Sequence, residues 1–259
     1  MGSQATSSVT GGCLRNAGIT SGHHQPFPPP AGESPPSLLS QFPRHAPRGR
    51  RFFFTNSPQH AGFFFGVHMQ TVAVLFARAD SVYKTLPGCD VYDMERDART
   101  WPGGAPVVAH PPCRAWGRLR AFAKPRHDEK DLARWSVAQV RRWGGVLEHP
   151  ESSTLWADQK LPRYQNERDG HGGWTMPIHQ SWFGHRAEKS TWLYIVGVNP
   201  WEVPDFPLRL GEATHVVQSR KRHDYRPHIT KAEREHTPPE LAAWLVELAR
   251  RCTLQPQPA

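Results

Sequence analysis

The chain has few cysteines and lacks any long apolar run. Its four cysteines are Cys13, Cys89, Cys113 and Cys252, and none forms a close Cys-x-x-Cys pair. This scatter argues against a zinc ribbon and against a disulfide scaffold. No run approaches the roughly 18–20 apolar residues that cross a bilayer, and no apolar signal-peptide core is visible near the start. We therefore expect a cytoplasmic protein that does not span a membrane.

Acidic residues are scarce relative to basic ones, with 23 Asp and Glu against 32 Lys and Arg, a net charge of +9. Such an excess is typical of nucleic-acid-binding proteins, although a basic tail produces the same balance. Residues 1–68 hold five arginines and one acid, so they carry +4 of the total and the rest carries +5. The argument for a nucleic-acid partner is correspondingly weaker for the remaining chain.

Residues 1–68 also lack regular patterning. They contain nine of the 26 prolines, and no period of 2 or 3.6 runs through them. We interpret them as a disordered, Pro-rich N-terminal extension or as the product of a start codon placed too far upstream. The composition changes at Met69, and residues 69–259 are expected to form a single domain.

From residue 71 onward, short β-rich runs alternate with helical patterns. The expected strands cover residues 71–77, 89–94, 105–109, 146–150 and 191–198, and the expected helices cover 80–86, 128–143 and 238–251. This alternation predicts an α/β fold, with a Rossmann-like, mostly parallel sheet and helices on both faces. Ligands of such sheets bind outside the carboxyl ends of the strands. In this sequence Asp93, His110–Cys113 and Glu148–Pro150 stand at those ends.

Cys113 is a candidate nucleophile at one strand end. It follows Pro111-Pro112, which stiffen the backbone, and arginines follow at positions 114, 118 and 120. Nearby positive charge lowers a thiol pKa and favours the reactive thiolate. A lone cysteine is as commonly a buried small hydrophobe, and local spacing leaves both roles open.

Glu148 ends the next expected strand. Its carboxyl group would lie beside the loop that carries Cys113, because neighbouring parallel strands end at the same edge. The two could combine a nucleophile with an acid or hydrogen-bond donor to a ring nitrogen. A salt-bridged or helix-capping glutamate is the alternative.

Six segments resemble, in order, the motifs of the DNA cytosine-5 methyltransferases over roughly residues 71–251. They are Leu75–Ala77, like the start of the cofactor loop; Asp93, like the acid for the cofactor ribose; Pro111-Pro112-Cys113, like the Pro-Cys nucleophile loop; Leu147-Glu148-His149, like the Glu-Asn-Val segment; residues 184–194, like a late basic motif; and residues 237–242, like the closing helix. The order of the segments is more specific than any one of them.

The resemblance implies a compact, phage- or prophage-type enzyme of a methyltransferase-like fold, with DNA as partner. No metal site is expected, because the spacings of His171, His179 and His185 match no standard ligand pattern. It implies catalytic roles for Cys113 and Glu148, S-adenosylmethionine binding by Phe76, Asp80, Ser81, Asp93 and Pro111, and substrate binding by Pro112, Arg118, His149, Arg186 and Lys189. The implied reaction is methylation of a flipped cytosine after attack of the cysteine on carbon 6.

Two departures from the family keep other interpretations open. The loop at residues 78–81 has no glycine, whereas the family's cofactor loop is glycine-rich to let backbone approach the ligand. Residues 199–237 are also too few for a full target-recognition domain. A catalytically degenerate nucleic-acid-binding protein of the same fold fits the first departure. An enzyme acting on a free pyrimidine nucleotide fits the second.

Overall fold

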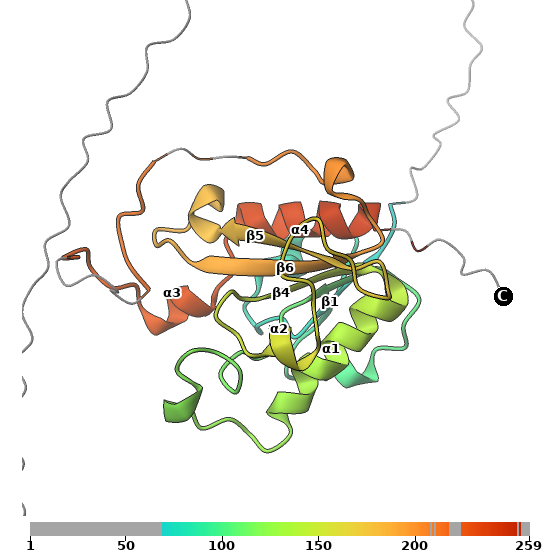
Figure 1. Ribbon diagram of the computed structural model, residues 1–259, viewed down its shortest axis with the longest axis horizontal. Coiled ribbons are helices and arrows are strands. Elements are labelled where there is room, and N and C mark those ends of the chain that lie inside the picture. The colour runs from blue at the N-terminus through green and yellow to red at the C-terminus, as the bar shows by residue number, and fades with distance from the viewer. Residues whose placement is uncertain (1–68, 208, 210, 218–223, 253, 255–259) are drawn as a thin grey trace, which may run out of the picture. The chain divides into compact units, whose positions relative to one another are not determined.

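A six-stranded β-sheet with helices on both faces organises the protein in the computed structural model, which describes residues 69–207, 209, 211–217, 224–252 and 254 (Figure 1). The strands are β1 (Val72–Leu75), β2 (Cys89–Tyr92), β3 (Val107–Ala109), β4 (Gly145–Pro150), β5 (Trp174–His179) and β6 (Ser190–Val196). Their order in the sheet is β2-β1-β3-β4-β6-β5. The α/β class predicted from the sequence is confirmed, and the expected extension of residues 1–68 lies outside the described residues.

The prediction of a mostly parallel sheet is wrong, because the sheet is mixed. Strand β1 pairs in parallel with β2 and β3, and β3 with β4, but β6 runs antiparallel to both β4 and β5. A buried apolar run such as that of β6 indicates a central strand without fixing its direction. The direction of β6 is set by β5, the strand that precedes it.

Strand β5 was not expected from the sequence, and Pro177 explains why. A proline cannot donate a ladder hydrogen bond and normally argues against a strand. Here β5 lies at the edge of the sheet, where an unpaired side is available, and Pro177 is exposed. The short run from Trp174 to His179 therefore pairs with β6 despite its proline.

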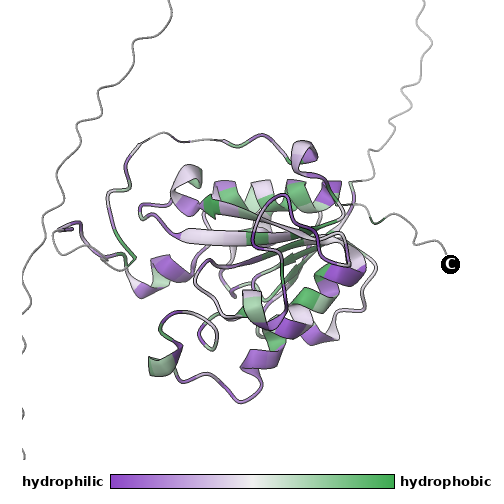
Figure 2. Cartoon of the chain, in the orientation of Figure 1, coloured by the Kyte–Doolittle hydropathy of each residue, from purple (hydrophilic) through white to green (hydrophobic). Residues whose placement is uncertain are grey.

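Two long helices cover opposite faces of the sheet. Helix α1 (Glu129–Trp143) packs on the face that carries Leu75, Ala109 and Leu147, and α4 (Pro239–Arg251) packs on the other. Figure 1 shows the two helices on either side of the strands, and Figure 2 shows apolar residues concentrated in the central strands and along α4. Each expected long helix begins within a residue of its observed start.

The remaining helices are short. They are α2 (Leu155–Asp158), α3 (Lys231–Glu235) and the 3-10 helices η1 (Val82–Thr85), η2 (Ala98–Thr100), η3 (Arg120–Phe122), η4 (Gln180–Phe183) and η5 (Pro200–Glu202). None of the helices in the described ranges is both long and apolar enough to cross a bilayer. The expected helix at residues 80–86 is only the single 3-10 turn η1.

The strand order places a switch point between β1 and β3. From β1 the chain moves to β2 on one side, and then crosses to β3 on the other side. At such a point the connections leave a crevice at the carboxyl ends of the strands, where ligands of open α/β sheets bind. The loop after β1 and the loop carrying Cys113 follow the two strands that meet at this switch point.

Candidate active site

Several of the expected residues lie together at the end of the sheet where the parallel strands β1 to β4 have their carboxyl ends. Cys113 lies three residues beyond His110, whose backbone continues the β3 ladder by bonding to the Leu75 carbonyl. Glu148 lies in β4, which pairs with β3. Lys189 precedes β6, and the antiparallel direction of β6 places this residue at the same edge.

Glu148 is held as a carboxylate by two hydrogen-bond donors. His110 Nδ1 lies 3.1 Å from Oε2, and Gln180 Nε2 donates to Oε1 at 3.0 Å. Burial raises the pKa of Glu148, but the His110 hydrogen bond and the positive charge of Lys189 outweigh it and hold the pKa at about 2. Glu148 is therefore ionised at neutral pH.

The hydrogen bonds extend beyond Glu148 on both sides. An ionised carboxylate can only accept, so His110 Nδ1 carries the proton between them. In the neutral ring, His110 Nε2 then accepts from the hydroxyl of buried Tyr83, 2.8 Å away. On the other side, Gln180 Nε2 also donates to Thr191 Oγ1 at 3.1 Å. The sequence marked His110 only as a strand-end residue and gave no signal for Gln180, because nothing local shows that η4 folds back against β4.

Cys113 is exposed, and its ionisation is not favoured in the way that the arginines suggested. Surrounding protein desolvates the sulfur and raises the pKa of Cys113 above its ordinary value of 9.0, and the charge of Glu148 raises it further. Lys189 is the cation that lowers it. The nearest arginine in sequence, Arg114, instead donates to the fully buried carboxylate of Glu129 at 2.6 Å. The expected thiolate activation by arginine is wrong.

Charges of both signs surround the thiol. Glu148 and Lys189 act on Cys113 from β4 and from the start of β6, and Glu235 at the end of α3 adds a further negative charge. Glu235 is itself paired with Arg78, which follows β1. The site thus joins the loops after β1 and β3 to α3.

The residues expected to bind a cofactor lie in the loops that follow strands β1, β2 and β3. Phe76 has φ of 63°, a left-handed conformation that is uncommon for residues with a β-carbon, and its ring packs edge-on against Trp135. Asp93 is buried, and hydrogen bonds from Lys84 Nζ and from the backbone of Arg96 lower its pKa to about 2. The sharp turn and the ionised carboxylate are thus both present.

Three further expected cofactor residues have structural partners or are buried. Asp80 is exposed and pairs with Arg78 and with His236. Ser81 caps η1 by accepting from the backbone of Tyr83. Pro111 is buried.

Some of the expected substrate residues lie beside the Cys113 thiol, and others are buried or paired elsewhere. Lys189 and half-buried Pro112 adjoin the thiol, and Arg118 is exposed further along the same loop. His149 is fully buried with no hydrogen-bond partner on either ring nitrogen, so it does not face the crevice edge with Glu148. Arg186 makes two hydrogen bonds to Glu233, at 2.8 and 2.5 Å.

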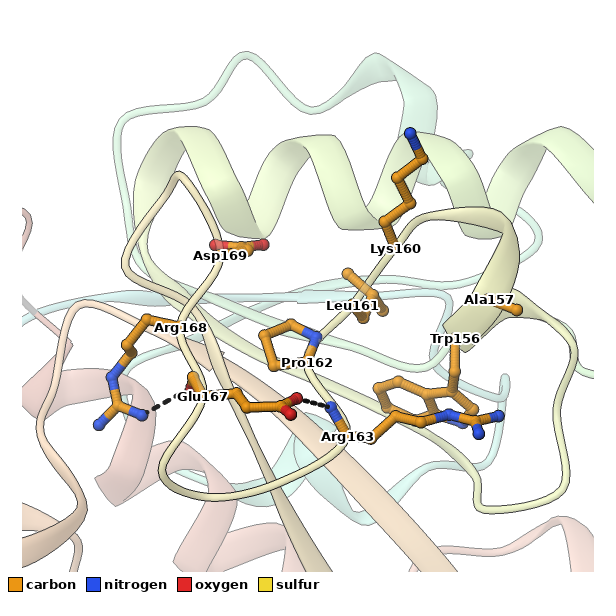
Figure 3. A pocket seen from close by; sticks show the side chains of 9 residues that line it. All are labelled: Trp156, Ala157, Lys160, Leu161, Pro162, Arg163, Glu167, Arg168 and Asp169. Carbon is orange, nitrogen blue, oxygen red and sulfur yellow. Dashed lines mark hydrogen bonds between the residues drawn. The ribbon is translucent and has the colours of Figure 1, made fainter.

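Two surface hollows lie apart from this constellation. A hollow of about 410 Å³ lies between α2 and residues 160–169, and Figure 3 shows Glu167 bonded to Arg163 and Arg168 at its rim. Its lining contains no cysteine, serine or histidine, so it offers no nucleophile or general base of those types. A second hollow of about 350 Å³ includes Arg186 and His185. Neither contains Cys113 or Glu148.

The described residues contain no candidate metal site. Within the described ranges, no group of three or more His, Cys, Asp or Glu side chains is arranged to hold an ion.

No protein-family model matches the chain, and no curated protein is significantly similar to it.

Proposed function

We propose that the protein is a DNA cytosine-5 methyltransferase-like enzyme with a Rossmann-like, methyltransferase-like sheet. The observation that carries the proposal is the placement of Cys113 and Glu148 at the carboxyl ends of adjacent strands β3 and β4, close enough for the charge of Glu148 to raise the pKa of Cys113. The switch point of the sheet lies beside them, where a ligand would enter.

In the proposed reaction, the Cys113 thiol gives its proton to water and its sulfur forms a bond to carbon 6 of a flipped cytosine. The electron pair of the double bond between carbons 5 and 6 moves through carbon 4 to nitrogen 3, which takes up a proton from water. Glu148, held as a carboxylate, accepts hydrogen bonds from the 4-amino group and from the protonated nitrogen 3. Once carbon 5 carries the methyl group that S-adenosylmethionine would supply, the protons of carbon 5 and nitrogen 3 pass to water, the double bond re-forms and the Cys113 thiolate leaves.

The cofactor residues fit S-adenosylmethionine in two respects. The left-handed conformation of Phe76 turns the backbone directly after β1, and Asp93 offers an ionised carboxylate at the end of β2. Among the described residues, Oδ2 of Asp93 accepts from Lys84 alone, which leaves a lone pair for a ribose hydroxyl. When bound, S-adenosylmethionine supplies an electrophilic methyl group for carbon 5.

A degenerate nucleic-acid-binding protein of the same fold is the second candidate. The ion pair between Lys84 and Asp93, 2.6 Å long, and the absence of glycine at residues 78–81 favour it. The ion pair occupies the carboxylate that the cofactor ribose would need, and a loop without glycine restricts the approach of its backbone to a ligand.

Trapping with 5-fluorocytosine separates these candidates. Fluorine cannot leave carbon 5 as a cation, so an active enzyme becomes covalently fixed to a duplex carrying this base in the presence of S-adenosylmethionine. We expect an adduct that disappears in Cys113→Ala and forms about 10–10²-fold more slowly in Glu148→Gln, because the carboxylate that accepts from the 4-amino group is lost. Cys89→Ala is the matched control, because half-buried Cys89 is at the start of β2. DNA binding without an adduct would assign the degenerate function, and turnover of a free pyrimidine nucleotide would assign the substrate differently.

A further inference from the structure

Helix α3 lies at the carboxyl end of the sheet, beside the candidate site. Glu235 at the end of α3 accepts a hydrogen bond from Arg78 Nη1 at 3.0 Å, and Arg78 follows β1. Glu233, earlier in the helix, accepts from Arg186, which precedes β6. Strands β3 and β4, whose ends carry the candidate site, lie between β1 and β6 in the sheet. With its two arginine partners, α3 therefore bridges the ends of β3 and β4, and Figure 1 shows it beyond the ends of the strands, on the left.

The helix is attached by charge and has no buried face. None of the five residues of α3, all of which the structure describes, is buried. Ile229 before the helix and Pro238 after it are buried, so apolar packing holds the chain on either side. A short helix without an apolar face is not stable by itself. Residues 231–236, hereafter the strap, are therefore a segment of low local stability that ion pairs keep in place.

The ion pairs of the strap lie at the surface. His236 adds a third contact to the two arginine pairs, because its Nε2 lies 3.0 Å from Asp80 Oδ2. A hollow of about 350 Å³, lined in part by Arg186, Glu233 and His236, leaves open space beside these contacts. Exposed ion pairs are weak and are screened by salt. The strap can therefore separate from the sheet without disrupting a packed core.

The acids of the strap occupy cations that an anionic ligand would use. Arg78 is paired with Glu235 and with Asp80. Glu235 also adds negative charge near Cys113. A phosphate group carries the same sign of charge as a carboxylate, and its oxygens accept from a guanidinium in the same bidentate way. The carboxylates of the strap and the phosphates of a ligand therefore compete for the same arginines.

We propose that the strap is an internal competitor of a DNA backbone, whose phosphate groups take its place on Arg78 and Arg186. This inference concerns the regulation of the candidate site and rests on the nucleic-acid substrate of the proposed function. The exchange replaces one set of ion pairs by another, and counterions released from the DNA favour it. Displacement of the strap also removes the charge of Glu235 from the neighbourhood of Cys113.

Hydrogen exchange on the full chain follows the strap directly. The amides of Arg234 and His236 donate to the carbonyls of Thr230 and Ala232 at 3.1 Å and report on its helical turn. In about 1 M NaCl without DNA, we expect these amides to exchange about two- to fivefold faster, which corresponds to the loss of a weak exposed ion pair. A saturating short DNA duplex should accelerate them at least as much, although contact with DNA normally protects amides. The amides of α4 are the internal reference and should not change.

Removal of the strap's negative charges should strengthen DNA binding. Glu233→Gln combined with Glu235→Gln frees both arginines, so we expect the duplex to bind about five- to tenfold more tightly. Asp131→Asn combined with Asp158→Asn is the matched control, because both acids pair with Arg134 on α1. The control removes the same amount of charge and should tighten binding by less than about twofold.

The outcomes separate this inference from the proposed reaction. Release of the strap by the duplex without a 5-fluorocytosine adduct supports the strap and contradicts the methyltransferase. An adduct that forms while the strap amides stay equally or better protected overturns the strap alone, as does equal binding by the double variant and its control. Inorganic triphosphate that releases the strap as strongly as the duplex, at equal phosphate concentration, overturns the assignment to DNA in favour of a free nucleotide. Absence of duplex binding by both the wild type and the double variant overturns both proposals.

Discussion

At the scale of single residues, the charge of Glu148 adds to desolvation in raising the pKa of the Cys113 thiol. Its carboxylate receives hydrogen bonds from His110 and Gln180 and keeps its charge even though it is buried. That charge opposes a second negative charge on Cys113. The resting site therefore holds a thiol and a carboxylate, and substrate binding has to change this balance before the sulfur can attack.

The Cys113 thiol should become more acidic when Glu148 loses its charge. In Glu148→Gln, we expect the pKa of Cys113 to fall and its alkylation rate near neutral pH to rise severalfold, because a repulsive charge is removed. Lys189→Gln should change the rate in the opposite direction. Mass-mapped iodoacetamide labelling across pH 6–10 measures both, and buried Cys252, whose pKa burial raises to about 12, serves as an internal slow reference. A slower Cys113 in Glu148→Gln would contradict this coupling.

His149 should make the fold sensitive to mild acid. Burial lowers the pKa of this histidine from 6.5 to about 4, so the folded state keeps it neutral while the unfolded state takes up a proton. This contribution is fully present above pH 6.5 and is lost as pH falls toward 4, amounting to about 3 kcal/mol. Glu148, with its depressed pKa of about 2, adds a separate loss that begins only below about pH 4.5.

Replacing the histidine isolates its contribution. We expect thermal melts of His149→Phe to lose most of the decline between pH 6.5 and 4 that the wild type shows. Exposed His127, changed to Gln, is the control and should leave the decline intact. An unchanged slope in His149→Phe would show that other groups cause the acid sensitivity.

At the scale of elements, the junction of β3 and β4 sets the position of Glu148. Gly145 begins β4 with φ of 122°, and a β-carbon there would lie 2.1 Å from the Val107 carbonyl oxygen. Only glycine has access to this conformation without strain, and the contact leaves no space for a methyl group. The close approach lets β4 pair with β3 from its first residue.

Gly145→Ala should therefore separate the two strands. We expect a loss of at least about 2 kcal/mol, from backbone strain together with the steric clash. This corresponds to a fall of roughly 5 °C or more in melting temperature for a domain of this size. Gly170→Ala, where no atom lies within 4 Å of the added β-carbon, is the control and should melt like wild type. Equal melting of the two variants would contradict this account.

Some strands and site contacts could be predicted from the sequence, and others could not. Continuous apolar runs predicted β1, β3 and β4 because buried strands carry their own pattern. Strand β5 was missed because Pro177 normally excludes a strand, and its tolerance depends on an edge position that only the assembled sheet defines. The pairing of Cys113 with Glu148 followed from strand ends, whereas Gln180 reaches Glu148 from a distant turn. Contacts of that kind are absent from local patterns.

At the scale of the whole molecule, the net charge of +9 is divided between two parts of the chain. Residues 1–68 carry +4, and residues 69–259, which contain the candidate site, carry +5. If the site around Cys113 and Glu148 provides the specific contacts, the N-terminal charges add only a general attraction to DNA. The affinity that comes from general attraction falls strongly as the salt concentration rises. The rate of covalent trapping at saturating DNA depends instead on the residues of the site.

A chain that begins at Met69 should distinguish the two contributions. We expect it to melt at the same temperature as the full chain, because the core described above lies entirely within residues 69–259. At saturating DNA it should form the 5-fluorocytosine adduct at the same rate, since Cys113, Glu148 and Lys189 are all retained. Its nonspecific affinity should fall at low salt, with a log–log salt slope smaller by at most about 4.5, which is roughly 0.9 for each of the five arginines removed. A melting temperature lower by many degrees would instead show that residues 1–68 contribute to the folded core, and an unchanged salt slope would show that their arginines do not contact DNA.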